Sequence, residues 1–480
     1  WFEHPSIPYP SAYRAPPHGP TAASPMASTT TTSAAKRRMG LCSLALLVAA
    51  PCSANSFLRR PSSSLASAFE DYVRLHQRTY VAGSEEWESR RQLFAQSLAL
   101  IEQQNADPER LWTAGPTKLS DRTPEEVAAL KGYSRGGRPE VLTAPAAMAL
   151  VSEAHQAFDT ALPSDFTWAS KLKATSDVQD QAHCGSCWAF SSSTVLRAHA
   201  ELFQKDRKFS VQQIVSCTPN PNECGGAGGC KGATAELAMD YVFKNGCQTS
   251  AEWAYDASDS SSNCPESLSE ANASQPVAAA PLSAASAVEI TRSAGLMGGM
   301  SFGMQGYKRL PENQLMPVMI TLVQKGPVVV SLAAGLQWGI YQGGILDACH
   351  RDAIIDHAVV LLGFGVGKKG NEKGAKYWHI QNSWGKFWGE DGFIRLGRQD
   401  NVAEREYCGM DTQPEIGSGC KGGPPEVRVC GACGLLYDVV VPEFELGEHG
   451  LWSSESFVER VRGAHGEAAQ TEAVEADKKH

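Results

Sequence analysis

The chain has 480 residues, 42% of them hydrophobic, so it can form more than one domain and bury a large core. Its net charge of −9 gives no electrostatic footprint for nucleic acid, and we expect no nucleic-acid partner. The 14 cysteines are many for a reducing cytosol and favour a secreted or vesicular compartment.

Residues 1–54 show no pattern of a folded domain. The first 35 are rich in Pro, Ser, Thr and Ala without a period, which is typical of disorder. Three basic residues at 36–38, an apolar run at 41–50 and small residues through Ala54 then follow the order of a secretory signal peptide, with Met26 or Met39 as the start. Because the run is too short to span a bilayer, we expect no membrane anchor after signal removal.

A charged helical region is expected from Ala66 to Asn105. Six of its residues are spaced by four, four, three, four and four, which keeps them on one helix face: Glu86, Arg90, Phe94, Ser97, Ile101 and Asn105. An amphipathic helix with a chance period is the alternative interpretation. Alternate positions then follow as an edge strand would place them, at Gly115, Thr117, Leu119 and Asp121.

A short helix is predicted directly after this strand, because residues 121–126 form a capped start with Pro124 in the first turn. Residues 134–160 contain Ala, Gly and Pro and are expected to be a linker, a suitable place for proteolytic cleavage.

Cys187 lies where a turn of small residues gives way to a helical apolar run, from Trp188 through Phe203. The thiol is therefore expected in the first turn of a helix, where free N–H groups and the positive end of the dipole favour an anion. A thiolate in that place has a depressed pKa and is a usable nucleophile.

Such a nucleophile needs a base, and His357 is the best candidate among the histidines because it begins a buried strand. Asn382, at the end of another strand, could hold the second ring nitrogen, with Trp384 covering that hydrogen bond from water. The backbone N–H of Cys187 and the side chain of Gln181 are the expected donors to an oxyanion.

These motifs, in this order, resemble those of papain-like cysteine peptidases of the cathepsin L type. The matching segments are Cys184-Gly185-Ser186-Cys187-Trp188, Tyr341–Ile345, Asn382-Ser383-Trp384-Gly385 and Trp388–Phe393, and the helix face resembles the E-R-F-N-I-N motif of the propeptides, with Ser97 replacing an Asn. The resemblance implies an α+β, papain-like two-domain fold, with a helical left domain and a β-barrel-like right domain, preceded by a helical propeptide. It places an inhibitory propeptide at 66–133 and the peptidase domain at 161–415.

The resemblance also implies an endopeptidase made as a zymogen, which cleaves peptide bonds through a thiolate–imidazolium pair and a thioester. No cofactor and no metal are expected. The implied partners are protein or peptide substrates and the chain's own propeptide, and the enzyme is expected to be a monomer in a lysosome-like or vacuole-like acidic compartment or outside the cell. The implied substrate-binding residues are Gly232, Ala233, Trp384 and Gln413.

The separation between Cys187 and His357 exceeds the roughly 130–150 residues typical of the family, so an insertion is expected. Residues 265–303 supply it and are predicted to form a surface loop that carries a glycosylation sequon at Asn272.

By resemblance, disulfides are expected for Cys184–Cys230, Cys217–Cys264 and Cys349–Cys408, and we add a fourth pair, Cys224–Cys247. Residues 416–480 are interpreted as a cysteine-containing extension with an acidic tail that includes a short helix near Phe457. Its three cysteines, Cys420, Cys430 and Cys433, are too few for a zinc site and favour a local disulfide with one thiol left over.

Two other functions remain open. The Cys184–Cys187 pair at a helix start is also a C-x-x-C motif, as in thiol–disulfide oxidoreductases. A catalytically inactive relative that serves as a binding or storage protein is the second alternative.

Overall fold

The computed structural model describes residues 64–131, 162–259, 264–265 and 298–445. The signal peptide, the linker at 134–160, the sequon at Asn272 and the helix near Phe457 lie outside these residues. No helix within the described ranges is long and apolar enough to cross a membrane.

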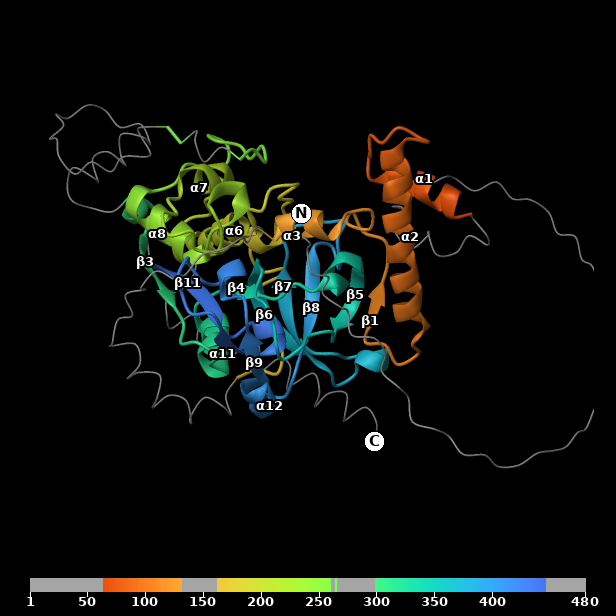
Figure 1. The fold of residues 1–480 in the computed structure, drawn as a ribbon. Coiled ribbons are helices and arrows are strands. Elements are labelled where there is room, and N and C mark those ends of the chain that lie inside the picture. The colour runs from red at the N-terminus through yellow and green to blue at the C-terminus, as the bar shows by residue number, and fades with distance from the viewer. Residues whose placement is uncertain (1–63, 132–161, 260–263, 266–297, 446–480) are drawn as a thin grey trace, which may run out of the picture. The chain divides into compact units, whose positions relative to one another are not determined.

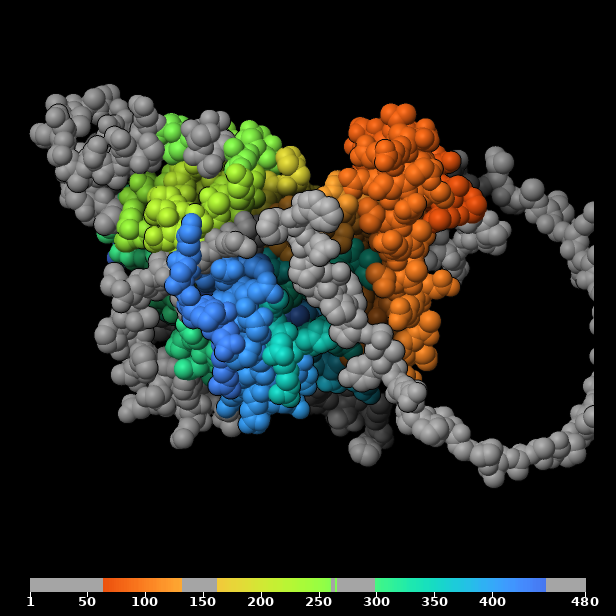
Figure 2. All heavy atoms as spheres, viewed as in Figure 1, coloured from red at the N-terminus to blue at the C-terminus, as the bar shows by residue number. Residues whose placement is uncertain are grey.

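The segment predicted to be a propeptide folds around two crossed helices, α1 (Leu65–Leu75) and α2 (Glu85–Ala106), followed by strand β1 (Trp112–Ala114) and helix α3 (Pro124–Leu130). Serine side chains cap the first two helices, and Thr123 and Glu126 form a reciprocal capping box on α3, as its sequence indicated. Figure 2 shows this orange segment as a lobe beside the yellow-green helical half.

Five of the six residues on one face of α2 contact the rest of this segment, whereas Glu86 is exposed and pairs with Arg90 on the same helix. Phe94 and Ile101 are buried, Arg90 pairs with Glu126, and the Ser97 hydroxyl donates to the Ser120 carbonyl. Asn105 both donates to and accepts from the backbone of Ala114, which fixes β1 against the helix. The spacing of these five residues is therefore a packing face and not a chance period.

The edge strand was expected at residues 115–121, and this expectation was wrong. The strand lies earlier, at β1, where its backbone pairs with β5 (Tyr341–Leu346). Thr117, Leu119 and Asp121 are instead buried in a turn, where their alternation reflects side-chain burial without strand pairing.

The helical half of the peptidase is built on α6 (Cys187–Phe203), which is buried along nearly its whole length. Small residues such as Ala189, Ser193 and Ala198 allow neighbouring elements to approach it from several sides. The helices α5 (Lys173–Ser176), α7 (Val211–Cys217) and α8 (Ala235–Asn245) pack against it, and Figure 1 labels α7 and α8 beside it. The turn η2 (Gly229–Lys231) contacts α7.

The other half is a largely antiparallel sheet that runs β1-β5-β8-β7-β6-β4-β11-β3, with β2 (Phe166–Thr167) paired to β6. Burial alternates along β8, whereas β4, β6 and the first part of β11 are buried on both faces, and α6 packs against β6. The remaining bounds are β3 (Met304–Arg309), β4 (Val328–Leu332), β6 (His357–Val366), β7 (Lys376–Gln381) and β8 (Phe393–Arg398).

Short elements surround this sheet. They are the helices α11 (Leu315–Gln324) and α12 (Asn401–Glu406), the 3-10 turns η3 (Gly298–Phe302), η4 (Leu336–Ile340), η5 (Gly370–Glu372), η6 (Pro414–Ile416) and η7 (Ala432–Gly434), and the paired strands β9 (Cys408–Asp411) and β10 (Val427–Cys430).

Residues 416–445, the described part of the region predicted as an extension, are not separate from the sheet. Strand β11 (Asp438–Phe444) inserts into the sheet between β4 and β3 and is almost wholly buried at its start. The apolar run at 435–441 therefore belongs to the same core, and residues 412–437, which include η6, β10 and η7, connect β9 to β11.

The end of the expected surface loop at 265–303 is also ordered against the core. In η3, Gly298 and Gly299 are buried, and a Cβ at either position would collide with the backbone of α8 or its C-terminus. Only glycine lets the chain return this closely to the helical half.

Five disulfides join the described residues. Cys184–Cys230 and Cys217–Cys264 are the expected pairs. The expected pairs Cys349–Cys408 and Cys224–Cys247 were wrong, because Cys349 bonds to Cys433, Cys408 to Cys430 and Cys224 to Cys420. The local Cys430–Cys433 bridge is thereby also excluded, and Cys187 and Cys247 are left as buried free thiols.

Candidate functional site

Cys187 is the first residue of α6, the helix start that its sequence position predicted, and its side chain is completely buried. The preceding residue, Ser186, is held by a hydrogen bond of 2.9 Å between its hydroxyl and the hydroxyl of Tyr255. The Cys187 sulfur donates a 2.9 Å hydrogen bond to the carbonyl oxygen of Lys131, just after the propeptide helix α3. The propeptide therefore lies directly on the thiol.

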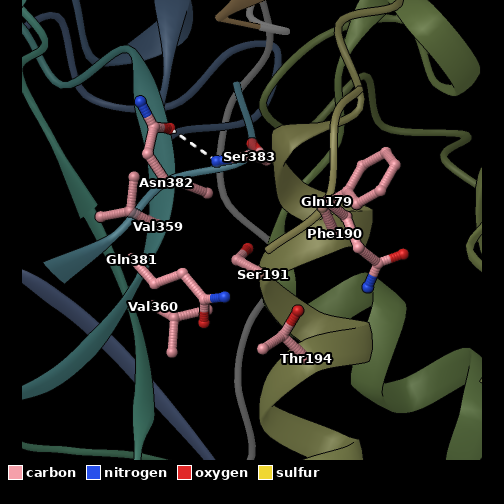
Figure 3. Close-up of a pocket in the computed structure, with 10 residues that line it drawn as sticks. Gln179, Phe190, Ser191, Thr194, Val359, Val360, Gln381, Asn382 and Ser383 are labelled. Atoms are coloured by element: carbon pink, nitrogen blue, oxygen red, sulfur yellow. Dashed lines mark hydrogen bonds between the residues drawn. The ribbon is translucent and has the colours of Figure 1, made fainter. Parts of the chain in front are cut away.

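His357 begins β6, and its Nε2 lies 2.9 Å from Oδ1 of Asn382. The same Oδ1 accepts from the backbone N–H of Ser383 at 2.8 Å, a contact drawn in Figure 3, and this second bond fixes the amide orientation. Because Oδ1 can only accept, the neutral ring carries its proton on Nε2 and leaves the lone pair on Nδ1. Nδ1 is buried and has no hydrogen-bond partner within the described ranges.

Two tryptophans pack against the imidazole, and a third supports them. The ring centroid of Trp384 lies 5.0 Å from that of His357, and that of Trp338 lies 5.9 Å away. Trp388 stacks on Trp338 and donates its indole N–H to the Trp338 carbonyl at 2.8 Å. Water is thereby kept from the His357–Asn382 hydrogen bond, which a lower local dielectric strengthens.

The start of α6, with Cys187, and the start of β6, with His357, lie close together where the two halves meet. Figure 3 shows the neighbouring part of this contact, with Phe190 and Ser191 of α6 opposite Val359 and Asn382. The charge state of the Cys187 sulfur is influenced by the backbone of Ala358 and the carboxylate of Asp356, the two residues that flank His357. The nucleophile and base candidates thus lie at one place.

Both groups are held neutral under the propeptide. Burial raises the pKa of Cys187 to about 12, although hydrogen bonds from the backbone of Ala358 and Trp188 lower it. Burial lowers the pKa of His357 to about 4, and the bond to Asn382 opposes it. The depressed thiol pKa expected from the helix terminus is therefore wrong for the covered site, because loss of water outweighs the dipole.

Gln181 is buried beside the thiol. Its Nε2 donates to the Leu130 carbonyl at 2.6 Å and to the Cys184 carbonyl at 2.8 Å, while its Oε1 accepts from Ser383 at 2.6 Å. The Leu130 carbonyl of the propeptide therefore accepts a hydrogen bond from Gln181 Nε2, the group predicted to donate to the oxyanion.

Further propeptide contacts fasten it on both sides of the thiol. Strand β1 pairs antiparallel with β5. The Lys118 ammonium binds the Asp180 carboxylate at 2.5 Å, and the Lys131 ammonium binds that of Asp356 at 2.7 Å. The segment thus contacts both halves of the peptidase.

Three residues of the site were missed by sequence reasoning. Tyr255 links Ser186 to the Gln181 carbonyl, Trp338 covers His357, and Asp356 receives Lys131. Asp356 offered a signal, since it directly precedes His357 in sequence, whereas Tyr255 and Trp338 reach the site only through the fold.

The expected substrate-binding residues Gly232, Ala233 and Gln413 lie at separate places in the fold. Gly232 has a φ of 97°, which suits only glycine, while Ala233 is fully buried and has no positive φ, so its side chain introduces no strain. Gln413 lines a cavity of about 330 Å³ formed with Pro414, Pro425 and Tyr437.

The fold excludes the oxidoreductase alternative. Cys184 is bonded to Cys230, so it is not available to form the redox disulfide with Cys187 that an oxidoreductase would need. The alternative of a catalytically inactive relative gains no support either. Cys187 and His357 keep the thiol and imidazole that the reaction needs, and Gln181 and Asn382 keep their hydrogen-bonding amides.

Comparison with known proteins gives the same picture. The model of the papain family cysteine protease matches residues 162–418, and that of the cathepsin propeptide inhibitor domain matches residues 69–127. A senescence-specific cysteine protease of Oryza sativa subsp. japonica is 27% identical over 73% of this chain and 90% of its own length. A cathepsin L-like proteinase of Phaedon cochleariae is 28% identical over 71% of this chain and 90% of its own length.

Solved structures agree with the fold. Procathepsin L 3 of the Tenebrio molitor larval midgut aligns with a TM-score of 0.55 at 20% identity, covering 80% of this chain and 100% of its own. A recombinant stem bromelain precursor aligns with a TM-score of 0.52 at 23% identity, covering 79% of this chain and 99% of its own. The predicted papain-like fold with a helical propeptide is confirmed.

The family model covers more than half of the chain, and a propeptide inhibitor domain precedes it. The chain is thus a cysteine endopeptidase made as a zymogen. It belongs to the papain family of cysteine proteases.

Proposed function

We propose that Cys187, His357, Asn382 and Gln181 carry out the peptide hydrolysis. The observation that supports this most is the meeting of the start of α6 with the start of β6, where the Cys187 sulfur lies against the residues flanking an imidazole held by Asn382. Removal of the propeptide returns water to the site and takes away the burial that keeps both groups neutral. A proton can then pass from the thiol to Nδ1, giving a thiolate–imidazolium pair.

In the reaction, the thiolate attacks the scissile carbonyl carbon. The oxyanion accepts hydrogen bonds from Gln181 Nε2 and the Cys187 backbone N–H, and the imidazolium gives its proton to the leaving amine. A water molecule, deprotonated by His357, then cleaves the thioester and releases the acid and the thiol. Asn382 keeps the ring in the orientation that serves both steps.

Substrate binding is assigned to Gly232, Ala233, Trp384 and Gln413. The peptide substrate binds in an extended conformation, and its backbone forms hydrogen bonds with the backbone of residues 232–233. The proposed compartment is the secretory route, ending in an acidic lysosome-like or vacuole-like organelle or outside the cell, where five disulfides persist. We further propose that the enzyme is a monomer without a membrane anchor and that its own propeptide inhibits it.

The test uses the two free cysteines of the described residues, Cys187 and Cys247, as a matched pair. Cys187→Ala is expected to fold and keep the propeptide but to lose all peptidase activity after proteolytic removal of the propeptide. Cys247→Ala, which removes the other buried thiol, is expected to retain activity within about threefold. Hydrolysis of a fluorogenic peptide measures both, and activity retained in Cys187→Ala would reject the assignment.

A further inference from the structure

Tyr255 connects the two chain segments that carry the proposed oxyanion donors. Its hydroxyl donates to the backbone carbonyl of Gln181 at 2.8 Å and lies 2.9 Å from the hydroxyl of Ser186. Because the tyrosine proton is used on the Gln181 carbonyl, the Ser186 hydroxyl donates to the tyrosine oxygen. Gln181 carries one donor in its side chain, and Ser186 directly precedes Cys187, whose N–H is the other. One hydroxyl group thus joins both donor segments.

Ser186 is the N-cap residue of α6, yet among the described residues its hydroxyl caps no N–H group of that helix. A serine in this position commonly accepts the N–H of the second or third helical residue. Here the hydroxyl bonds to Tyr255 and, at 3.4 Å, to the Cys184 carbonyl. It therefore does not compete for the N–H groups at the start of α6, and those of Cys187 and Trp188 lower the pKa of the thiol through hydrogen bonds.

The Gln181 side chain is oriented by a different residue, Ser383. Gln181 Oε1 accepts the Ser383 hydroxyl at 2.6 Å, and the Gln181 backbone N–H donates to the Ser383 carbonyl at 2.9 Å. The amide nitrogen is thereby directed toward the Leu130 carbonyl, an acceptor oxygen that fits this donor in the covered site. Since Ser383 sets the direction of the amide, the contact with Tyr255 is left to set the spacing between Gln181 and the start of α6.

The segment around Tyr255 is itself fastened to α7. The Trp253 carbonyl accepts the Ser210 hydroxyl at 2.7 Å, and the Asp256 N–H donates to Gln212 Oε1 at 3.2 Å. The tyrosine ring also packs edge-on against Phe190 of α6, with ring centroids 4.7 Å apart. Burial raises the pKa of the Tyr255 hydroxyl to about 12, so the group remains a donor at acid and neutral pH. Tyr255 is therefore a fixed support for both of its partners.

We propose that Tyr255 is a positioning residue for the oxyanion donors, because its hydroxyl sets the spacing between Gln181 and the start of α6. Two donors stabilise an oxyanion together only when both lie at hydrogen-bond distance from one point. The inference rests on the proposed function, which assigns Gln181 Nε2 and the Cys187 N–H as those donors. It adds a residue that acts through them and does not itself touch the substrate.

Tyr255→Phe removes the hydroxyl and keeps the ring that packs on Phe190. In the processed enzyme, kcat on a fluorogenic peptide is expected to fall about tenfold while KM stays within about twofold, because stabilisation is lost only in the transition state. Alkylation of Cys187 by iodoacetamide forms no oxyanion, and its rate and pH profile are expected to match the wild type. Tyr307→Phe, which removes a half-buried hydroxyl on β3, is the matched control and should hydrolyse the peptide like the wild type.

A double-mutant cycle separates positioning from general structural support. Gln181→Ala removes one donor and is expected to lower kcat about a hundredfold. Tyr255→Phe added to Gln181→Ala should then cost less than about threefold more, since the remaining donor no longer has to be matched to a second one. Ser186→Ala removes the other end of the same hydroxyl bridge and is expected to lower kcat at least about threefold, with unchanged alkylation.

A wild-type kcat in Tyr255→Phe would overturn the proposal. Equal falls in hydrolysis and alkylation, or a tenfold loss that persists in the Gln181→Ala background, would overturn it as well. If Tyr255→Phe does not fold, Ser186→Ala decides, and a wild-type kcat in that variant contradicts the positioning role. If Gln181→Ala keeps the wild-type kcat, or the wild type hydrolyses no peptide, the proposed function itself fails, and the role of Tyr255 fails with it.

Discussion

The Cys187 sulfur donates a hydrogen bond of 2.9 Å to the carbonyl oxygen of Lys131. The neighbouring carbonyl, of Leu130, accepts from Gln181 Nε2 at 2.6 Å. Two consecutive propeptide carbonyls thus engage the nucleophile candidate and the oxyanion-donor candidate. Burial keeps the thiol and the imidazole neutral, and the Lys131 charge of the same segment further lowers the pKa of His357. Inhibition in this zymogen is therefore both steric and electrostatic.

Lys131→Met is expected to weaken propeptide inhibition. The Lys131 ammonium is the partner of the buried Asp356 carboxylate, whose pKa is raised by burial and held down by Lys131. Removing it leaves that carboxylate without its cation, which costs on the order of 2–4 kcal/mol when a buried pair is broken. Autocatalytic processing at pH 5 should become at least tenfold faster, as followed by gel electrophoresis.

The matched control is Arg74→Met, because Arg74 is exposed and pairs only with Asp71 inside the propeptide. Its processing rate should stay within twofold of the wild type. Equal processing of Lys131→Met and wild type would contradict a role for this ion pair in inhibition.

Asp121→Asn is expected to loosen the propeptide. This fully buried carboxylate accepts hydrogen bonds from Tyr72, Arg78 and Tyr80, each at about 2.8–2.9 Å. A neutral amide leaves the Arg78 guanidinium without its anion and turns one acceptor into a donor, at a cost of about 3 kcal/mol.

Hydrogen exchange in the Cys187→Ala zymogen measures this effect, since that variant cannot process itself. Amides of α1 and α2 should exchange about a hundredfold faster in Asp121→Asn. The surface variant Asp71→Asn is the control, and unchanged protection in Asp121→Asn would show that the buried cluster does not hold the propeptide together.

Stability is expected to fall as pH rises from about 4.5 to about 8, because of Glu236. Burial, with the nearby Asp438 carboxylate, raises the pKa of this α8 side chain from 4.5 to about 8, and Arg309 of β3 lies 3.6 Å away. Within that range the folded chain keeps a proton that the unfolded chain has lost, so unfolding becomes easier at higher pH.

Glu236→Gln should remove part of this dependence. Between pH 5 and pH 7.5 the wild-type Tm is expected to drop by several degrees more than that of the variant, measured by scanning calorimetry. Glu443→Gln, on a more exposed ion pair with Lys308, should behave as the wild type. A pH slope unchanged by Glu236→Gln would rule out this group as the source.

Much of the fold and site could be predicted because each element carried a local signal. The α2 face has a helical period, α3 has its capping box, and Cys187 follows a turn at a helix start. His357 and Asn382 lie at strand ends, where short-range patterns and family motifs agree.

What could not be predicted depends on contacts distant in sequence. Cys224 and Cys420 are separated by 196 residues, and no local pattern distinguishes that pair from the alternatives. The place of β11 between β4 and β3 likewise follows from the sheet as a whole. The charge state of Cys187 was misjudged because burial by Lys131 is a property of the assembled zymogen.

The most direct test of the account is the rate at which iodoacetamide alkylates Cys187, measured by mass spectrometry from pH 4 to pH 9 in the zymogen and in the processed enzyme. We expect almost no reaction in the zymogen below pH 8, since its thiol is covered and protonated, and a rate at least a hundredfold higher in the processed enzyme at pH 5–7. Equal rates in the two forms, or a processed enzyme that reacts only above pH 8, would contradict a thiolate paired with His357.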